Sequence, residues 1–239
     1  MRILTALLAA IALALPAVAP AAIRATYGST EPGRTLVVEV ADNGEARIGE
    51  AGAPDYGILR DGHFHIVGRA GDGVTVARIE DVAAAIDRVM APIFGTLLDN
   101  ARDGRPATVT LRSQRRGTRT VGGRTGQVIA VYGLNSDLPG VETEFVFSDD
   151  PALKPLGRAL EGFMNAAMLP AAPVIGKAAA ETIDQTRALF AFGTPLVAGK
   201  GLVLQSIETV DLPAARFELP SRPASVDQLV AAMKAAPAP

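Results

Sequence analysis

The chain has 239 residues, and its 23 lysines and arginines nearly balance 25 aspartates and glutamates. This balance argues against a general nucleic-acid binder. Cysteine is absent, which excludes disulfides, a thiol nucleophile and a thiolate metal site. The length is sufficient for a hydrophobic core that needs no such support, and no motif predicts a cofactor.

The N-terminus has the order of a secretory signal peptide. A cation at Arg2 precedes an apolar run over Ile3–Leu15, and small residues follow. The run is too short to span a bilayer comfortably, and the small residues favour cleavage after Ala21. We therefore expect a soluble periplasmic or secreted protein, not an integral membrane protein, with residues 22–239 forming a single domain. Its last residues, 237–239, are expected to fray.

The first part of the mature chain predicts short strands joined by glycine turns. Thr35–Val40 alternates, with Leu36 and Val38 on one face, and the Asn43–Gly44 pair that follows is typical of a hairpin turn. Further strands are predicted at 46–50, 56–60, 63–69 and 74–79. The connections are too short for crossover helices, so neighbouring strands should be antiparallel.

Two helices are predicted within the strand pattern. Apolar residues recur at helical spacing from Ile79 onward, which predicts a helix over 80–91. An irregular continuation past Pro92 to Asn100 stays open, because proline disfavours an unbroken helix there. Asp150 and Pro151 form a typical helix start, which predicts a second helix over 151–168.

The remaining pattern predicts more strands and a short closing helix. Strands are expected at 107–112, 119–121, 126–134, 141–148, 186–192, 202–210 and 216–219. Ser225 and Gln228 form a capping box for the last helix. About ten antiparallel strands with helices between them predict an α+β domain.

Three segments resemble the LolA/LppX-like superfamily of exported lipoprotein and lipid carriers and related periplasmic domains. They are the glycine turn and strand at 121–132, the outward-charged strand and capped helix at 141–150, and the closing segments at 193–220, which contain Phe217-Glu-Leu-Pro220. The resemblance implies an antiparallel half-barrel whose helices cover its concave face and hold acyl chains against it. The chain departs from the pattern in one respect, because Phe145 and Phe147 stand where relatives often have tryptophan.

The apolar faces provide the candidate ligand-binding residues. Strand residues and methionine-containing helix faces are included, because methionine adapts to variable apolar ligands. The candidates are Leu36, Val38, Ile48, Met90, Phe145, Phe147, Phe163, Met164 and Phe217. The alternative is that these side chains only fill a core between sheet and helices.

Two polar features have both a simple and a functional interpretation. His63 and His65 lie on one strand face, but no further ligand is positioned beside them, so exposed histidines without a metal are expected. Arg112, Arg115, Arg116 and Arg119 surround a polar hairpin. They are either a solvated turn or a contact for lipid headgroups or an acidic envelope protein.

Three functions stay open from the sequence. The first is a non-enzymatic exported protein that binds an acyl chain or lipid between a curved sheet and lid helices. The second is an envelope interaction protein of the same fold without cargo. The third is a carboxylate-dependent hydrolase, although no nucleophile elbow, phosphate loop or zinc motif is present.

Overall fold

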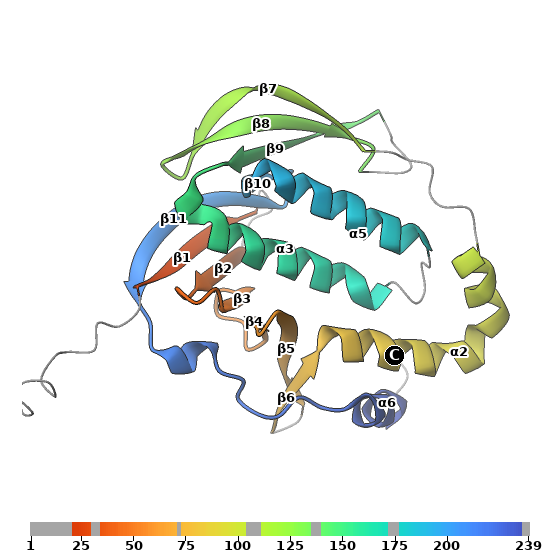
Figure 1. The fold of residues 1–239 in the computed structure, drawn as a ribbon. Coiled ribbons are helices and arrows are strands. Elements are labelled where there is room, and N and C mark those ends of the chain that lie inside the picture. Colours follow the sequence, from red (N-terminus) through yellow and green to blue (C-terminus); the bar gives the residue numbers. More distant parts are fainter. Residues whose placement is uncertain are drawn as a thin grey trace, which may run out of the picture.

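Eleven strands form one antiparallel sheet in the computed structural model, which describes residues 21–29, 34–70, 73–103, 111–134, 140–171 and 177–235 (Figure 1). The strand order is β6-β5-β4-β3-β2-β1-β11-β10-β9-β8-β7, and the sheet does not close, because β6 and β7 are its edges. The strands are β1 (Ala21–Gly28), β2 (Thr35–Val40), β3 (Ala46–Glu50), β4 (Tyr56–Arg60), β5 (His63–Ala70), β6 (Gly73–Arg78), β7 (Arg112–Val121), β8 (Arg124–Tyr132), β9 (Glu142–Ser148), β10 (Thr194–Ala198) and β11 (Leu202–Asp211). The predicted α+β class, a curved antiparallel sheet with helices, is confirmed.

The first strand was not predicted, yet it joins the two halves of the sheet. β1 pairs with β2 on one side and with β11 on the other, and Ala21 lies opposite Asp211. The first and last strands of the chain are therefore neighbours in the middle of the sheet. Residues 1–20 of the predicted signal peptide lie outside the described residues.

Helices occupy the inner side of the curved sheet (Figure 1). α3 (Lys154–Met168) crosses the sheet, and its Leu156 and Leu160 are buried in the main core with Val38 and Ile48. Fully burying a side chain of this size contributes about 1.5–3 kcal/mol. α5 (Lys177–Leu189) lies beside α3, whereas α2 (Ile79–Asp103) starts at the edge strand β6. Within the described part of the chain, no helix is both long and apolar enough to cross a membrane.

Two predicted strands are helical, and that part of the prediction is wrong. Residues 186–192 belong to α5 and the short η3 (Phe190–Phe192), and residues 216–219 begin in η4 (Ala214–Phe217). Short apolar runs do not separate strand from helix by their period alone. Packing decides here, because Leu189 and Phe192 contact the cluster around Phe147.

Two other boundaries differ from the sequence prediction. α2 continues through Pro92 to Asp103, where the sequence predicted a helix over 80–91 and left an irregular continuation to Asn100 open. Proline removes one backbone hydrogen bond, and the helix tolerates that loss. β7 is one strand of ten residues rather than two short ones, whereas residues 104–110 lie outside the described residues.

The chain after β11 crosses the outer face, which is the side of β1–β6 that points away from α3. Leu212 and Phe217 pack on Ala22, and farther along Leu219 packs on Ile58. The amide of Ala224 then donates to the carbonyl of Val76 on the edge strand β6, 2.8 Å away. This contact covers part of an otherwise open sheet edge.

The closing helix α6 (Val226–Ala235) packs on α2. The predicted capping box is confirmed: the Gln228 amide donates to Ser225 Oγ at 3.3 Å, and the Ser225 amide donates to Gln228 Oε1 at 2.9 Å. Arg88 on α2 also pairs with Asp227 at 2.5 Å. The C-terminal segment is therefore fixed at both the outer face and α2.

Candidate functional site

A groove of about 810 Å³ lies between the C-terminal half of α3 and strands β1–β5. Its walls are largely apolar. The apolar side chains from the sheet and from α3 are Leu36, Ile48, Phe64, Phe163, Met164 and Leu202. Volumes of this size are typical of small-molecule sites, which are concave and mostly apolar.

The groove has a rigid floor. Tyr27 on β1 is only 1% exposed, and its hydroxyl donates to the Pro195 carbonyl at 2.9 Å. Burial raises the pKa of Tyr27, so the phenol stays neutral and serves as a structural donor. The hydrogen bond connects β1 to β10 across the intervening β11.

Small residues make room for the apolar walls. A Cβ at Gly57 would lie 2.2 Å from the Phe64 ring, so a side chain at this position would displace the ring. Phe64 then meets Phe163 of α3 with ring centroids 6.1 Å apart. On the helix side, the short side chains of Ala166 and Ala167 border the groove. The space results from small residues placed opposite large rings.

Charged residues at the rim balance one another. Arg34 pairs with Glu50 at 3.5 Å, and the Asp55 carboxylate accepts a hydrogen bond from the Arg69 amide at 3.2 Å. Lys200 also borders the groove. An apolar interior with a polar rim suits a molecule that has an apolar chain and a polar end.

Four of the predicted ligand-binding residues line this groove: Leu36, Ile48, Phe163 and Met164. Val38 is fully buried in the main core beneath α3. Met90 is half-buried on α2 and is not among the groove residues.

The three predicted phenylalanines outside α3 lie elsewhere. Phe145 and Phe147 stack on each other at 5.7 Å and pack with the end of α5, in a cluster separate from the groove. Phe217 lies on the outer face, because η4 replaces the predicted strand. Placing these three on one ligand-binding face was therefore wrong.

Sequence reasoning missed Tyr27 and Phe64. Tyr27 was missed because the strand Ala21–Gly28 begins at the last residue of the predicted signal peptide, which obscures the alternation of the strand. Phe64 stands between two histidines, and the strand pattern around it was available as a signal. Alternation along β5 places Phe64 on the inner face.

The two histidines differ in environment although they share a strand face. His63 is partly exposed. The Nη2 atom of Arg78 lies 2.6 Å from its Nδ1, and the Oε1 atom of Glu80 lies 3.5 Å from the same nitrogen. His65 is 6% exposed, so the prediction of exposed histidines is wrong for it. Burial lowers the pKa of His65. Among the described residues, no group of three or more His, Asp or Glu side chains is arranged to hold a metal ion.

The predicted arginine hairpin is paired across the sheet. Arg116 on β7 donates to the Tyr132 hydroxyl at 2.9 Å and to Glu142 at 3.2 Å, and Arg119 donates to Glu144 at 2.6 Å. The side chain of Arg112 lies over the Tyr132 ring, and Arg115 is exposed on the same strand. Two of the four charges, those of Arg116 and Arg119, are therefore offset by carboxylates of β9.

The fold and groove define an α+β protein with an open antiparallel sheet and an apolar groove under one helix. No family model, curated protein or solved structure matches the chain. The resemblance to LolA-like carriers therefore remains a prediction from the sequence.

Proposed function

We propose that the chain binds the apolar chain of an amphiphile, such as a fatty acid or lipid, in the groove between α3 and β1–β5. The observation that carries this proposal is the groove of about 810 Å³ with an apolar lining and a polar rim. Each methylene that leaves water for such a lining favours binding by about 0.8 kcal/mol. No catalytic group is needed, since sequestration alone performs the function.

The proposed binding uses the boundary between helix and sheet. Phe163 and Met164 come from α3, and Phe64 comes from the sheet. Methionine is flexible, so its side chain adapts to ligands of different shape. A shift of α3 relative to the sheet would open or close the groove. The predicted signal peptide would place this binding outside the cytoplasm.

The experiment is a native mass spectrum of protein purified without detergent, followed by oleate titration of the delipidated protein. A lipid-sized adduct that is lost on denaturation, or saturable oleate binding, supports the proposal. If neither is found, the proposal is rejected, and an envelope protein that acts through its surface becomes the better hypothesis.

Two matched variants localise the binding. Ala167 and Ala152 are both exposed alanines at opposite ends of the η1–α3 segment, where η1 spans Pro151–Leu153, and only Ala167 borders the groove. Ala167→Trp should weaken oleate binding by roughly tenfold or more because the indole fills the groove. Ala152→Trp should bind like the parent protein. Equal binding by all three proteins would place the ligand elsewhere.

A further inference from the structure

The outer face carries a charged row whose residues do not line the groove, although the hollow beside the row shares Gly49, Glu50 and Tyr56 with the groove lining. The register places Arg24, Glu39 and Arg47 directly opposite one another on β1, β2 and β3. Residues opposite each other on neighbouring strands point to the same side of a sheet. Arg216 reaches this row from η4, which lies 177 residues after Glu39 in the chain.

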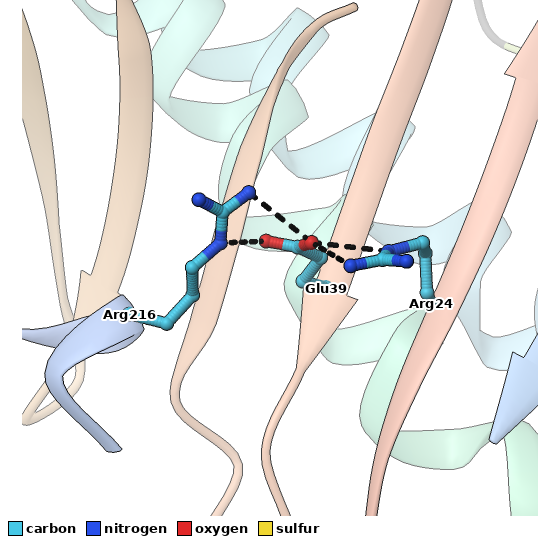
Figure 2. A network of polar contacts seen from close by, with 3 residues as sticks. All are labelled: Arg24, Glu39 and Arg216. Atoms are coloured by element: carbon cyan, nitrogen blue, oxygen red, sulfur yellow. Dashed lines mark hydrogen bonds and ion pairs between the residues drawn. The ribbon is translucent and has the colours of Figure 1, made fainter. Parts of the chain in front are cut away.

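Glu39 is buried between two arginines (Figure 2). It is 2% exposed, and its two carboxylate oxygens accept from Arg216 at 2.8 and 3.3 Å and from Arg24 at 3.0 and 3.1 Å. Burial raises the pKa of Glu39, but the hydrogen bonds from Arg216 and Arg24 outweigh it and hold the pKa below its usual value. Glu39 is therefore ionised, and its oxygens are occupied.

Arg47 is the third cation of the row, and it lacks a comparable partner. Its guanidinium carbon lies 3.7 Å from the centroid of the Tyr56 ring, which fixes the side chain in place. Its Nε is buried without a hydrogen-bond partner in the described part of the chain. Burial and then the positive charge of Arg216 lower the pKa of Arg47, and the opposing effect of Glu39 is smaller.

The three arginines surround a hollow of about 330 Å³. Glu39 and Glu50 are the carboxylates at its lining, and Glu50 also pairs with Arg34 at 3.5 Å. The rest of the lining is small or apolar, from Val37, the turn residues 51–53 and Tyr56. Positive charge therefore exceeds negative charge in a concave, partly buried place with room for more than a single ion.

We propose that this hollow binds a phosphate group, with Arg47 and Arg216 as its principal donors. Guanidinium groups present paired N–H donors that match the oxygens of phosphate. A phosphate between Arg47 and Arg216 would also replace a repulsive contact with two attractive ones. The group comes either from a soluble phosphate monoester or from a lipid headgroup, and the chemistry at the arginines is the same for both. The site does not depend on the function proposed for the groove.

The test titrates the protein with inorganic phosphate and, separately, with dihexanoyl phosphatidic acid, using calorimetry at low ionic strength. Arg47→Gln removes the cation without touching the Glu39 pairs, and it should weaken phosphate binding by about tenfold or more. Arg158→Gln removes an equal charge from the exposed side of α3, away from the hollow, and should bind like the parent. Arg47→Lys keeps the positive charge but loses the paired N–H donors of the guanidinium group. Its affinity for phosphate should therefore lie between those of the parent and of Arg47→Gln.

Each result decides the proposal. Variant-sensitive binding of inorganic phosphate supports a soluble ligand, whereas variant-sensitive binding of the lipid alone assigns the site to a headgroup. Binding that is equal in Arg47→Gln and Arg158→Gln, or absent for both probes in the parent, overturns it. The thermal midpoint of ligand-free Arg47→Gln checks that this variant is folded. Oleate binding by the same variant reports separately on the groove.

Discussion

Two groups of arginines in this protein differ in the way that they are assembled. Arg112, Arg115, Arg116 and Arg119 are close in sequence and lie exposed on β7, where Glu142 and Glu144 offset much of their charge. Arg24, Arg47 and Arg216 are far apart in sequence and meet around the buried Glu39. Density of charge along the chain therefore did not identify the concave place where distant arginines gather.

The difference has an energetic consequence. Exposed ion pairs are screened by water and contribute little, commonly about 0–1 kcal/mol. Breaking a buried pair leaves a charge without its partner and is much more destabilising. The β7 pairs should thus be replaceable, whereas the Glu39 network should be needed for the outer face and for the attachment of η4.

The largest expected effect is that of Glu39→Gln. Two arginines lose their common counterion, and the free energy of unfolding should fall by about 3 kcal/mol, measured by urea denaturation. Glu144→Gln, which removes the exposed partner of Arg119, is the matched control and should cost less than about 1 kcal/mol. Equal losses in the two variants would abolish the distinction between the two groups.

The second effect is acid destabilisation through Glu39. Its folded pKa lies below the ordinary value of 4.5, so the unfolded chain takes up the proton first as the pH falls. The stability contributed by this carboxylate is present above pH 4.5 and is lost as the pH falls from there through the folded pKa. One such proton changes the free energy of unfolding by at most about 1.4 kcal/mol per pH unit. Urea denaturation of the parent and of Glu39→Gln at a series of pH values should give different slopes of the free energy of unfolding against pH. Equal slopes would contradict the prediction.

A smaller pH effect is expected from His65. Burial first, and also the nearby charge of Arg78, lower its pKa from 6.5, so the folded protein binds the proton less readily than the unfolded chain. Stability should therefore decrease as the pH falls below 6.5, which is opposite to a histidine with a paired carboxylate. His65→Gln should reduce this slope between about pH 6.5 and pH 5. Equal slopes in the parent and in His65→Gln would contradict the assignment.

The smallest effect concerns the β7 arginines. A double-mutant cycle of Arg119→Gln and Glu144→Gln should give a coupling of about 0.2–1 kcal/mol, and added salt should reduce it. Thermal unfolding of the four proteins measures it. A coupling as large as the loss in Glu39→Gln would mean that exposure on β7 does not weaken the pair.

Much of the fold could be predicted from local pattern. The strands from Thr35–Val40 to Gly73–Arg78, the Asp150 cap of η1 just before α3 and the Ser225–Gln228 cap all follow from alternation and capping, and these signals involve neighbours in the chain. The strand β1 and the helix α5 did not follow in the same way. The predicted signal peptide obscured the first, and the second has an apolar run that fits either structure until packing selects one.

The candidate site could be predicted only in part, for the same reason. Leu36, Ile48, Phe163 and Met164 were selected because apolar faces can be read from periodicity, and they line the groove. Phe145, Phe147 and Phe217 were equally apolar, but the path of the chain sends them to two other clusters. Periodicity predicts that a side chain is buried, but it does not predict which other residues that side chain packs against.

The sequence by itself therefore determined the alternating strands, the helix caps, the near-neutral charge and the apolar faces, because each depends on composition or on residues a few positions apart. Only the tertiary structure decided that β1 lies next to β11, that Arg216 reaches Glu39 and that Arg47 is left beside a hollow. These features depend on contacts between distant segments. Such contacts form when burial outweighs the entropy of closing long loops, and no local pattern records that balance.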